Sequence, residues 1–254
     1  MLYGLYTAAA GSLIEKAKLE IVSNNLANVD TTGFRKAYVN ARERLAETQA
    51  ASGRSVSMSV LLGGGGVFLD RVQLDSSAGA VQETQEPLDL AIDGSGFFGV
   101  SDGENTYYTR AGSFTIDAEN QIATPDGRYR LLGGGGEPLT LSGGASGGPV
   151  TVTKDGVIYQ GANEIGRLKL ADFTDLENLE ARGDNTLLYT GDGGEIASTA
   201  RVRQGYLEKS NASTVQELSE MILAMRSYEA SNRMLRTFDT TLQRTVNDVG
   251  AMPR

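Results

Sequence analysis

The chain has 254 residues, of which 40% are hydrophobic and 22% charged, a balance typical of a folded protein. It contains no Cys, His or Trp, which excludes disulfides, zinc sites and Ser-His or Cys-His catalytic triads. The net charge of −9 is concentrated in residues 51–200, which hold nine Lys and Arg against 21 Asp and Glu, so no basic patch indicates a nucleic-acid partner. No apolar run is long enough to indicate a membrane span, and the first residues lack the basic and apolar regions of a cleaved secretory signal.

Residues 1–28 are predicted to form an amphipathic helix, because apolar side chains recur on one face and charged ones lie elsewhere. Gly4 and Gly11 would each weaken an isolated helix by about 1 kcal/mol, but the small residues next to Gly11 permit the close approach of a neighbour. Two arrangements are open for this helix: packing on a globular core, or pairing with the other end of the chain. The apolar face carries Tyr6, Ala10, Leu13, Ile14, Ala17 and Ile21.

A strong helix-stop signal follows in residues 23–36, which read SNNLANVDTTGFRK. The Asn, Asp and Thr side chains compete for backbone hydrogen bonds, and Gly33 can adopt a positive φ. Leu26, Val29 and Phe34 keep apolar contacts available through the turn. The stretch therefore predicts the end of the helix and an ordered loop.

The hydrophobic period changes from helical to two between residues 54 and 205. Short runs of β-branched and aromatic residues are separated by Gly and by Asp-Gly pairs, which favour tight hairpin turns. We therefore predict an antiparallel all-β domain inserted between two terminal helices. The predicted strands cover residues 67–69, 88–92, 97–100, 106–109, 113–116, 150–153, 157–159, 165–170, 187–189 and 203–207.

The last forty residues carry the strongest helical pattern, with mostly apolar positions at alternating steps of three and four. A helix over residues 213–249 would be about 55 Å long, and a sustained stripe of this spacing favours a partner helix. The N-terminal helix is the only candidate. Two polar positions, Asn232 and Asp239, either fix the register of the pair or mark places where the stripe turns outward. The positions are Leu218, Met221, Met225, Tyr228, Asn232, Leu235, Asp239, Leu242, Val246 and Val249.

No combination of side chains indicates an enzyme. Residues 94–99 spell G-x-G-x-x-G, but dinucleotide binding requires a helix to begin there, and the residues that follow predict a hairpin. The carboxylates of the Asp-Gly pairs are expected to serve turns, and no nucleophile has a base beside it. The sequence predicts no catalytic residue, no cofactor and no metal.

Three sets of fragments together resemble one family, the axial proteins of the bacterial flagellum, its rod and hook. They are residues 23–36 quoted above, IDGSGFF at 92–98 with YTRAGSF at 108–114, and GYLEKSN at 205–211 with RSYEA at 226–230. The length is unlike that of the hook protein, which carries additional outer β material. LYTA at 5–8 and IGRLKL at 165–170 are more similar to the proximal rod subunit, which is favoured, although residues 96–98 and 112–114 suit the distal rod subunit at least as well.

The pattern and the resemblance imply an α+β fold. Long N- and C-terminal helices would pair as a coiled coil, with an inserted all-β antiparallel domain. Residues 1–33 and 211–254 would form the discontinuous coiled-coil core domain, residues 34–87 an extended connecting arm, and residues 88–205 the β domain.

The resemblance also implies a structural subunit of the flagellar rod, the drive shaft of the basal body. Such a subunit is exported by the flagellar type III apparatus and polymerises into a hollow helical shaft that transmits torque in the periplasm. Expected partners are further copies of the chain, other rod and hook proteins and the export apparatus, without nucleic acid or membrane insertion. The expected assembly interface comprises Tyr6, Leu13, Ala17, Ile21, Asn25, Leu26, Asn28, Gly33, Phe34, Leu218, Met221, Met225, Tyr228, Leu235, Leu242, Val246 and Val249.

Two other classes of function stay open at this point. A ligand-binding β domain with an oligomerising helix would require a pocket of aromatic side chains with convergent polar groups. A hydrolase that uses carboxylates would require turnover that a single Asp or Glu substitution abolishes.

Overall fold

A computed structural model describes residues 2–43, 67–143, 147–191 and 194–250. The chain divides into two compact units. Unit 1 comprises Met1–Ala27, Ala37–Gln73 and Ser213–Arg254, and unit 2 comprises Asn28–Lys36 and Leu74–Ala212. The chain therefore passes between the units several times, and both of its ends belong to unit 1. The predicted α+β class, with a β domain between two terminal helices, is confirmed.

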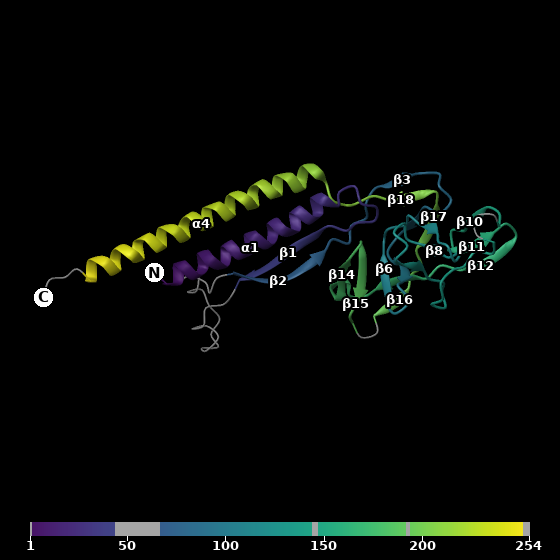
Figure 1. Ribbon diagram of the computed structural model, residues 1–254, viewed down its shortest axis with the longest axis horizontal. Helices are drawn as coiled ribbons and strands as arrows, with labels where there is room; N and C mark the ends of the chain where they lie inside the picture. Colours follow the sequence, from purple (N-terminus) through teal and green to yellow (C-terminus); the bar gives the residue numbers. More distant parts are fainter. Residues whose placement is uncertain (1, 44–66, 144–146, 192–193, 251–254) are drawn as a thin grey trace. The chain divides into compact units, whose positions relative to one another are not determined.

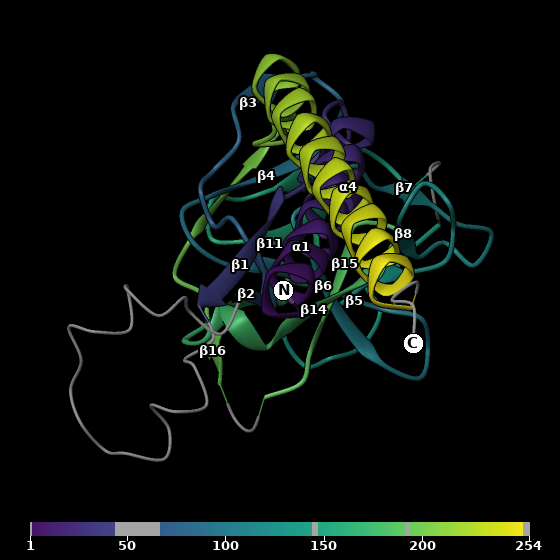
Figure 2. The ribbon, with the colours of Figure 1, turned by 90° about the vertical axis from the view of Figure 1, so that its left-hand side faces the viewer.

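Unit 1 is built on two helices, α1 (Leu2–Ala27) and α4 (Thr214–Gly250), which lie side by side and run in opposite directions (Figures 1 and 2). Strand β1 (Ala37–Glu43) lies along α1 and pairs with β2 (Val67–Leu74). The sequence analysis missed β1. Ser213 precedes α4, and its carbonyl accepts the first helical hydrogen bond from the Glu217 N–H at 2.9 Å. Of the predicted connecting arm, residues 44–66 lie outside the described residues.

The inward stripe of α4 differs in part from the predicted one. Met221, Tyr228, Asn232, Leu235 and Leu242 are half-buried as expected, but at the levels of residues 218, 225 and 239 the inward position is shifted by one residue. Leu218 and Met225 are exposed, and Asp239 is also exposed, which fits the alternative that the stripe turns outward there. The stripe that faces inward, with steps of four and three, is Glu217, Met221, Ala224, Tyr228, Ser231, Leu235, Phe238 and Leu242.

Unit 2 contains most of the strands. A nine-stranded antiparallel sheet has the order β14-β15-β6-β5-β9-β8-β7, with β13 pairing with both β5 and β16. Smaller ladders join β10, β11 and β12, then β4 with β17, then β3 with β18. The bounds are β3 (Val81–Glu83), β4 (Leu90–Asp93), β5 (Phe97–Ser101), β6 (Thr106–Thr109), β7 (Thr115–Ile116), β8 (Ile122–Ala123), β9 (Arg130–Leu131), β10 (Val150–Val152), β11 (Val157–Gln160), β12 (Asn163–Arg167), β13 (Leu170–Phe173), the 3-10 turn η2 (Leu176–Asn178), β14 (Leu179–Gly183), β15 (Thr186–Tyr189), β16 (Glu195–Ala197), β17 (Arg201–Gln204) and β18 (Tyr206–Glu208).

The core of unit 2 follows from the alternation of apolar residues along these strands. Phe98, Val100 and Ile158 are fully buried, and the Phe98 and Phe114 rings meet edge to face with centroids 5.5 Å apart. A second cluster surrounds Phe173. Two predicted strands are broken in the structure: residues 165–170 are divided between β12 and β13, and residues 203–207 between β17 and β18. The second break lies at Gly205, whose φ of +78° interrupts the extended backbone.

The predicted helix stop is confirmed. Helix α1 ends at Ala27, and the Thr31 N–H donates to the Asn28 carbonyl at 3.2 Å in the turn that follows. Gly33 has a φ of +66°, in the left-handed region that glycine adopts readily.

Candidate assembly site

The contact between the two helices of unit 1 is close because small residues lie on the α1 side. A Cβ added to Gly4 would lie 3.0 Å from Cζ of Phe238, and one added to Gly11 would lie 4.0 Å from Oγ of Ser231. The seven-residue step along α1 is matched by a seven-residue step back along α4, so the two helices keep a constant register. Glycines at both contact positions of α1 allow the two helix backbones to approach closely.

A buried polar contact lies at the other end of the helix pair. It is fourteen residues beyond Gly11 on α1 and fourteen residues before Ser231 on α4. The Asn25 Nδ2 group donates to Oε2 of Glu217 at 3.1 Å and to the Ala37 carbonyl at 2.8 Å, and Asn25 Oδ1 accepts from the Ala37 N–H at 3.0 Å. Asn25 and Glu217 are 2% and 1% exposed. One amide thus joins the end of α1, the start of β1 and the first turn of α4, where the helix dipole favours the negative charge of Glu217.

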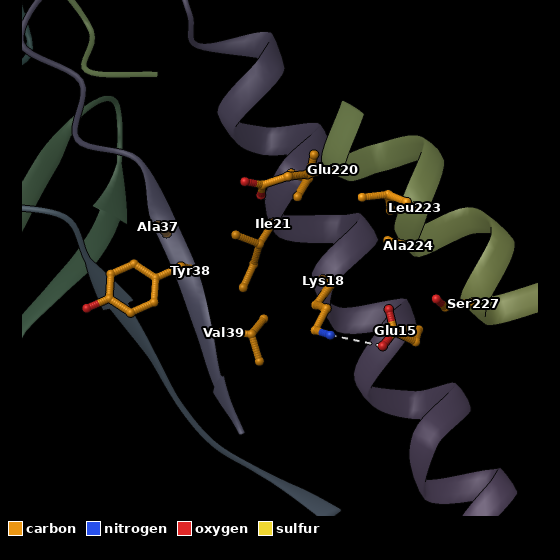
Figure 3. A pocket seen from close by; sticks show the side chains of 11 residues that line it. Glu15, Lys18, Ile21, Ala37, Tyr38, Val39, Glu220, Leu223, Ala224 and Ser227 are labelled. Atoms are coloured by element: carbon orange, nitrogen blue, oxygen red, sulfur yellow. Dashed lines mark hydrogen bonds and ion pairs between the residues drawn. The ribbon is translucent and has the colours of Figure 1, made fainter. Parts of the chain in front are cut away.

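A groove of about 330 Å³ lies over α1, between β1 on one side and α4 on the other (Figure 3). Its wall contains Val39 from β1 and Leu223 from α4, with Ile21 between them, and an ion pair of 2.9 Å joins Lys18 to Glu15 along its edge. The groove is lined by Glu15, Lys18, Ile21, Val22, Ala37, Tyr38, Val39, Glu220, Leu223, Ala224 and Ser227. Tyr38 and Leu223 are largely exposed in this arrangement.

Unit 2 contains a buried ion cluster centred on Glu208. Its Oε1 lies 2.7 Å from Nη2 of Arg35 and its Oε2 lies 3.2 Å from Nη1 of Arg110, and all three side chains are buried. Oε1 also accepts from the Gly79 N–H at 2.9 Å, and Nη2 of Arg110 donates to the Gly94 carbonyl at 2.7 Å. Two guanidinium groups share one carboxylate out of water, so the loss of the carboxylate would leave buried charge uncompensated.

The ion cluster joins the three sets of fragments that the sequence analysis singled out. Arg35 comes from residues 23–36, Arg110 from residues 108–114 and Glu208 from residues 205–211. Asn211 adds further links, because its Oδ1 accepts from the Lys36 N–H at 2.7 Å and its Nδ2 donates to the Ser77 carbonyl at 3.0 Å. These segments are distant in sequence but adjacent in the fold.

Gly33 is required where two of these segments touch. A Cβ on Gly33 would lie 2.2 Å from the carbonyl carbon of Arg110, and the positive φ adds strain for any other residue. We expect Gly33→Ala to lower the free energy of unfolding by about 3 kcal/mol or more, measured by chemical denaturation. Gly103→Ala is the matched control, because Gly103 also has positive φ but has no atom within 4 Å of the added Cβ. Equal losses in the two variants would contradict the close contact.

The interface residues expected from the sequence are distributed over both units. Asn25 is buried at the helix contact and Gly33 beside the ion cluster, whereas Leu13 is 69% exposed and points away from the α1–α4 contact. The side chains of Tyr6, Val246 and Val249 lie outside those the structure describes. Half-buried positions are Ala17, Ile21, Leu26, Asn28, Phe34, Met221, Tyr228, Leu235 and Leu242, and exposed ones are Leu218 and Met225.

Sequence reasoning missed the charged residues that unite the motifs. Arg35, Arg110 and Glu208 stand inside the quoted fragments, and Glu217 opens the last helix, but the sequence analysis assigned no role to their charges. The available signal was one acidic and two basic residues embedded in otherwise apolar or turn-forming fragments. Such residues are rarely buried unless they are paired.

Burial changes the ionisation of two groups in unit 2. It lowers the pKa of the Arg110 guanidinium, while the neighbouring Glu208 carboxylate acts in the opposite direction. Burial also raises the pKa of Tyr108 well above its ordinary value of 10, helped by the hydrogen bond that its hydroxyl donates to Oε2 of Glu195 at 2.7 Å.

The raised pKa of Tyr108 predicts a loss of stability in alkali. Above about pH 10 the unfolded chain releases the Tyr108 proton while the folded protein keeps it, so the free energy of unfolding falls as pH rises. This contribution is fully present below pH 10. We expect Tyr108→Phe to reduce the alkaline slope, measured by denaturant unfolding between pH 8 and 11. Identical slopes for the two proteins would contradict it.

The described residues offer little support for a metal site, a dinucleotide site or an aromatic ligand pocket. No group of three or more acidic side chains in the described ranges is arranged to hold a metal ion. Strand β5 begins at Phe97, where the dinucleotide motif would require a helix. A second cavity, of about 260 Å³ in unit 2, is bordered by Arg35, Arg110 and Asp172, but Phe97 is its one aromatic side chain. Among the described helices, none has a segment long and apolar enough to cross a membrane.

Comparison with known proteins gives family matches in three regions of the chain. Residues 5–35 match the family described as flagella basal body rod protein, residues 91–160 match the flagellar hook protein FlgE/F/G D1 domain, and residues 203–248 match the flagellar basal body rod FlgEFG protein C-terminal. These three matched regions contain Arg35, Arg110 and Glu208, respectively.

Whole-length relatives carry the same description. Flagellar basal-body rod protein FlgG of Bacillus subtilis (strain 168) is 32% identical, with 97% of this chain and 99% of the relative covered. FlgG of Caulobacter vibrioides is 32% identical over 95% of this chain and 97% of the relative. FlgF of the same bacterium is 34% identical over 91% of both chains. The chain therefore belongs to the family of flagellar basal-body rod proteins, which are structural components of the basal body rod.

Proposed function

We propose that this chain is a rod subunit that polymerises with further copies of itself into a hollow helical shaft and transmits torque. The observation that carries the proposal is the antiparallel helix pair of unit 1, which is formed by the two ends of the chain and keeps apolar side chains exposed on its outer surface. Exposed apolar surface of this extent marks a site of association. Such a subunit performs no catalysis, in keeping with the structural family to which the chain belongs.

The helix pair supports a coiled coil. The contacts of Gly4 with Phe238, Gly11 with Ser231 and Asn25 with Glu217 are separated by multiples of seven residues, first one heptad and then two. The inward positions of α4 alternate in steps of four and three, the spacing of knobs that fit into holes of a partner helix. We propose that residues 1–33 and 211–254 form the core of the shaft, residues 34–87 the connecting arm and residues 88–205 an outer β layer.

Other rod and hook proteins are the proposed neighbours along the axis, and the flagellar type III apparatus is the proposed route of export. The lack of Cys is compatible with passage of an unfolded chain into the oxidising periplasm. Relatives named FlgG and FlgF match over similar lengths. The proposal therefore covers a rod subunit in either the proximal or the distal position.

Deletion of this chain from its own bacterium tests the proposal. We expect cells without hooks, filaments or motility, and basal bodies with an interrupted rod in electron micrographs. Expression of the intact chain should restore all of these structures. Complete rods in the deletion strain would show that the chain is not a required rod subunit.

A further inference from the structure

Two surfaces of unit 1 remain without a partner in the described part of the chain. The first is the groove between β1 and α4 (Figure 3). The second is an apolar ridge on α4, formed by Val215, Leu218, Ile222 and Met225, which are 75%, 43%, 52% and 48% exposed. Four large apolar side chains in three helical turns are more than scattered surface residues.

The ridge and the groove lie on opposite flanks of the same helix. At about 100° per residue, the centre of the ridge is roughly 160° around α4 from the residues that line the groove, which are Glu220, Leu223, Ala224 and Ser227. The ridge cannot enter the groove of its own chain, because the two surfaces lie on opposite sides of the same helix, α4. The two surfaces overlap along α4, because the ridge covers residues 215–225 and the groove-lining residues of α4 cover 220–227.

The ridge has the form of a helix face that enters a groove. Its members follow one another at steps of three, four and three, the spacing of anchors in helix-in-groove recognition. The groove offers apolar side chains to meet them, including Ile21, Val22, Val39 and Leu223. Shape and polarity therefore match between the two surfaces.

Charge is also complementary. Glu220 lies in the groove, and Arg226 lies one helical turn after Ile222 on the ridge side of α4. Within the described ranges neither side chain has an ion-pair partner, whereas Glu15 in the same groove is paired with Lys18. An unpaired anion in the groove and an unpaired cation beside the ridge would meet when two copies associate.

From this we infer that the groove of one subunit receives the ridge of a second copy of this chain. The contact is heterologous, because each copy contributes a different surface, and a free ridge and a free groove remain at the two ends of every open assembly. Repetition of such a contact gives a ring if the rotation closes and an open helix if it does not. The inference rests on the proposed function and names the lateral contact of the shaft.

Cysteine cross-linking in assembled rods tests this contact cleanly, because the chain has no Cys of its own. Ile222→Cys places a thiol on the ridge and Ser227→Cys places one on the groove wall. In basal bodies purified from cells that carry the double variant, a short bis-maleimide should produce a ladder of dimers, trimers and larger species. Either single variant should remain monomeric, because like positions do not meet. Ile222→Cys combined with Glu104→Cys, an exposed position in unit 2, is the matched control and should give no ladder.

Each outcome has a distinct meaning. Dimers from Ile222→Cys alone would show that ridges meet each other, and would overturn the inference. Rods that contain the double variant but give no ladder would overturn it while leaving the proposed function intact. Absence of the intact chain from purified rods would overturn the proposed function together with the contact.

Charge reversal provides a second test. Glu220→Arg and Arg226→Glu should each reduce incorporation into rods by about fivefold, since like charges would then face each other across the contact. The double variant should restore incorporation because the pair is re-formed with opposite polarity. Equal loss in the double variant, with helix content unchanged in circular dichroism, would overturn the pairing.

Discussion

Cells that carry Leu235→Asp are expected to export the protein but to build no rod. Leu235 belongs to the inward stripe of α4, between the positions at which Ser231 and Phe238 meet α1. The substitution removes apolar contact and places a charge where no cation of α1 is positioned to meet it, at a cost of about 3–5 kcal/mol. This exceeds the stability that an isolated helix pair can spare, so α1 and α4 should separate.

The purified variant should lose helix content in circular dichroism, while the core of unit 2, which contains none of these residues, keeps its β signal. Thr237→Asp introduces the same charge at an exposed position two residues away and should cost about 0.5 kcal/mol or less. Normal swimming by the Leu235→Asp strain would mean that the helix pair is not needed for assembly.

Glu208→Gln is expected to be the most damaging single change in unit 2. Glutamine has the same shape and can still accept from the Gly79 N–H, but it removes the negative charge that pairs directly with both Arg35 and Arg110. Breaking a buried ion pair in this way costs about 3–5 kcal/mol. The three segments around residues 33–36, 110 and 205–211 should then separate before the sheet unfolds.

Glu180→Gln is the control for this change, because Glu180 forms an exposed pair with Arg182 at 3.1 Å that should contribute less than about 1 kcal/mol. Denaturant unfolding of both variants gives the comparison. If Glu208→Gln were as stable as Glu180→Gln, the cluster would not hold the segments together.

The helices and many of the strands could be predicted from the sequence because each carries a local signal. The steps of three and four found α4, and Asp-Gly turns bounded β5 and β6. Strands β8 and β9 have only two residues each and carry no period that could be detected. Residues 165–170 read as one apolar run, although the backbone divides it between two ladders.

Three of the eight described positions of the predicted α4 stripe are exposed, and at two of them the physical reason is clear. Hydrophobicity alone selected Leu218 and Met225, but the positions that face α1 at those levels are Glu217 and Ala224. Close packing favours a small residue at 224, and hydrogen bonding to Asn25 allows a carboxylate at 217. The pattern of apolar residues alone does not distinguish a helix face that packs within the chain from a face that stays exposed. The ridge on α4 is a face that stays exposed.

Cryo-electron microscopy of purified basal bodies tests the central claim most directly. Density for this chain should lie in the rod, with α1 and α4 near the axis, the β strands of unit 2 at larger radius and the ridge of each copy against the groove of the next. Helices on the outside of the shaft, or density for this chain outside the rod, would contradict the account.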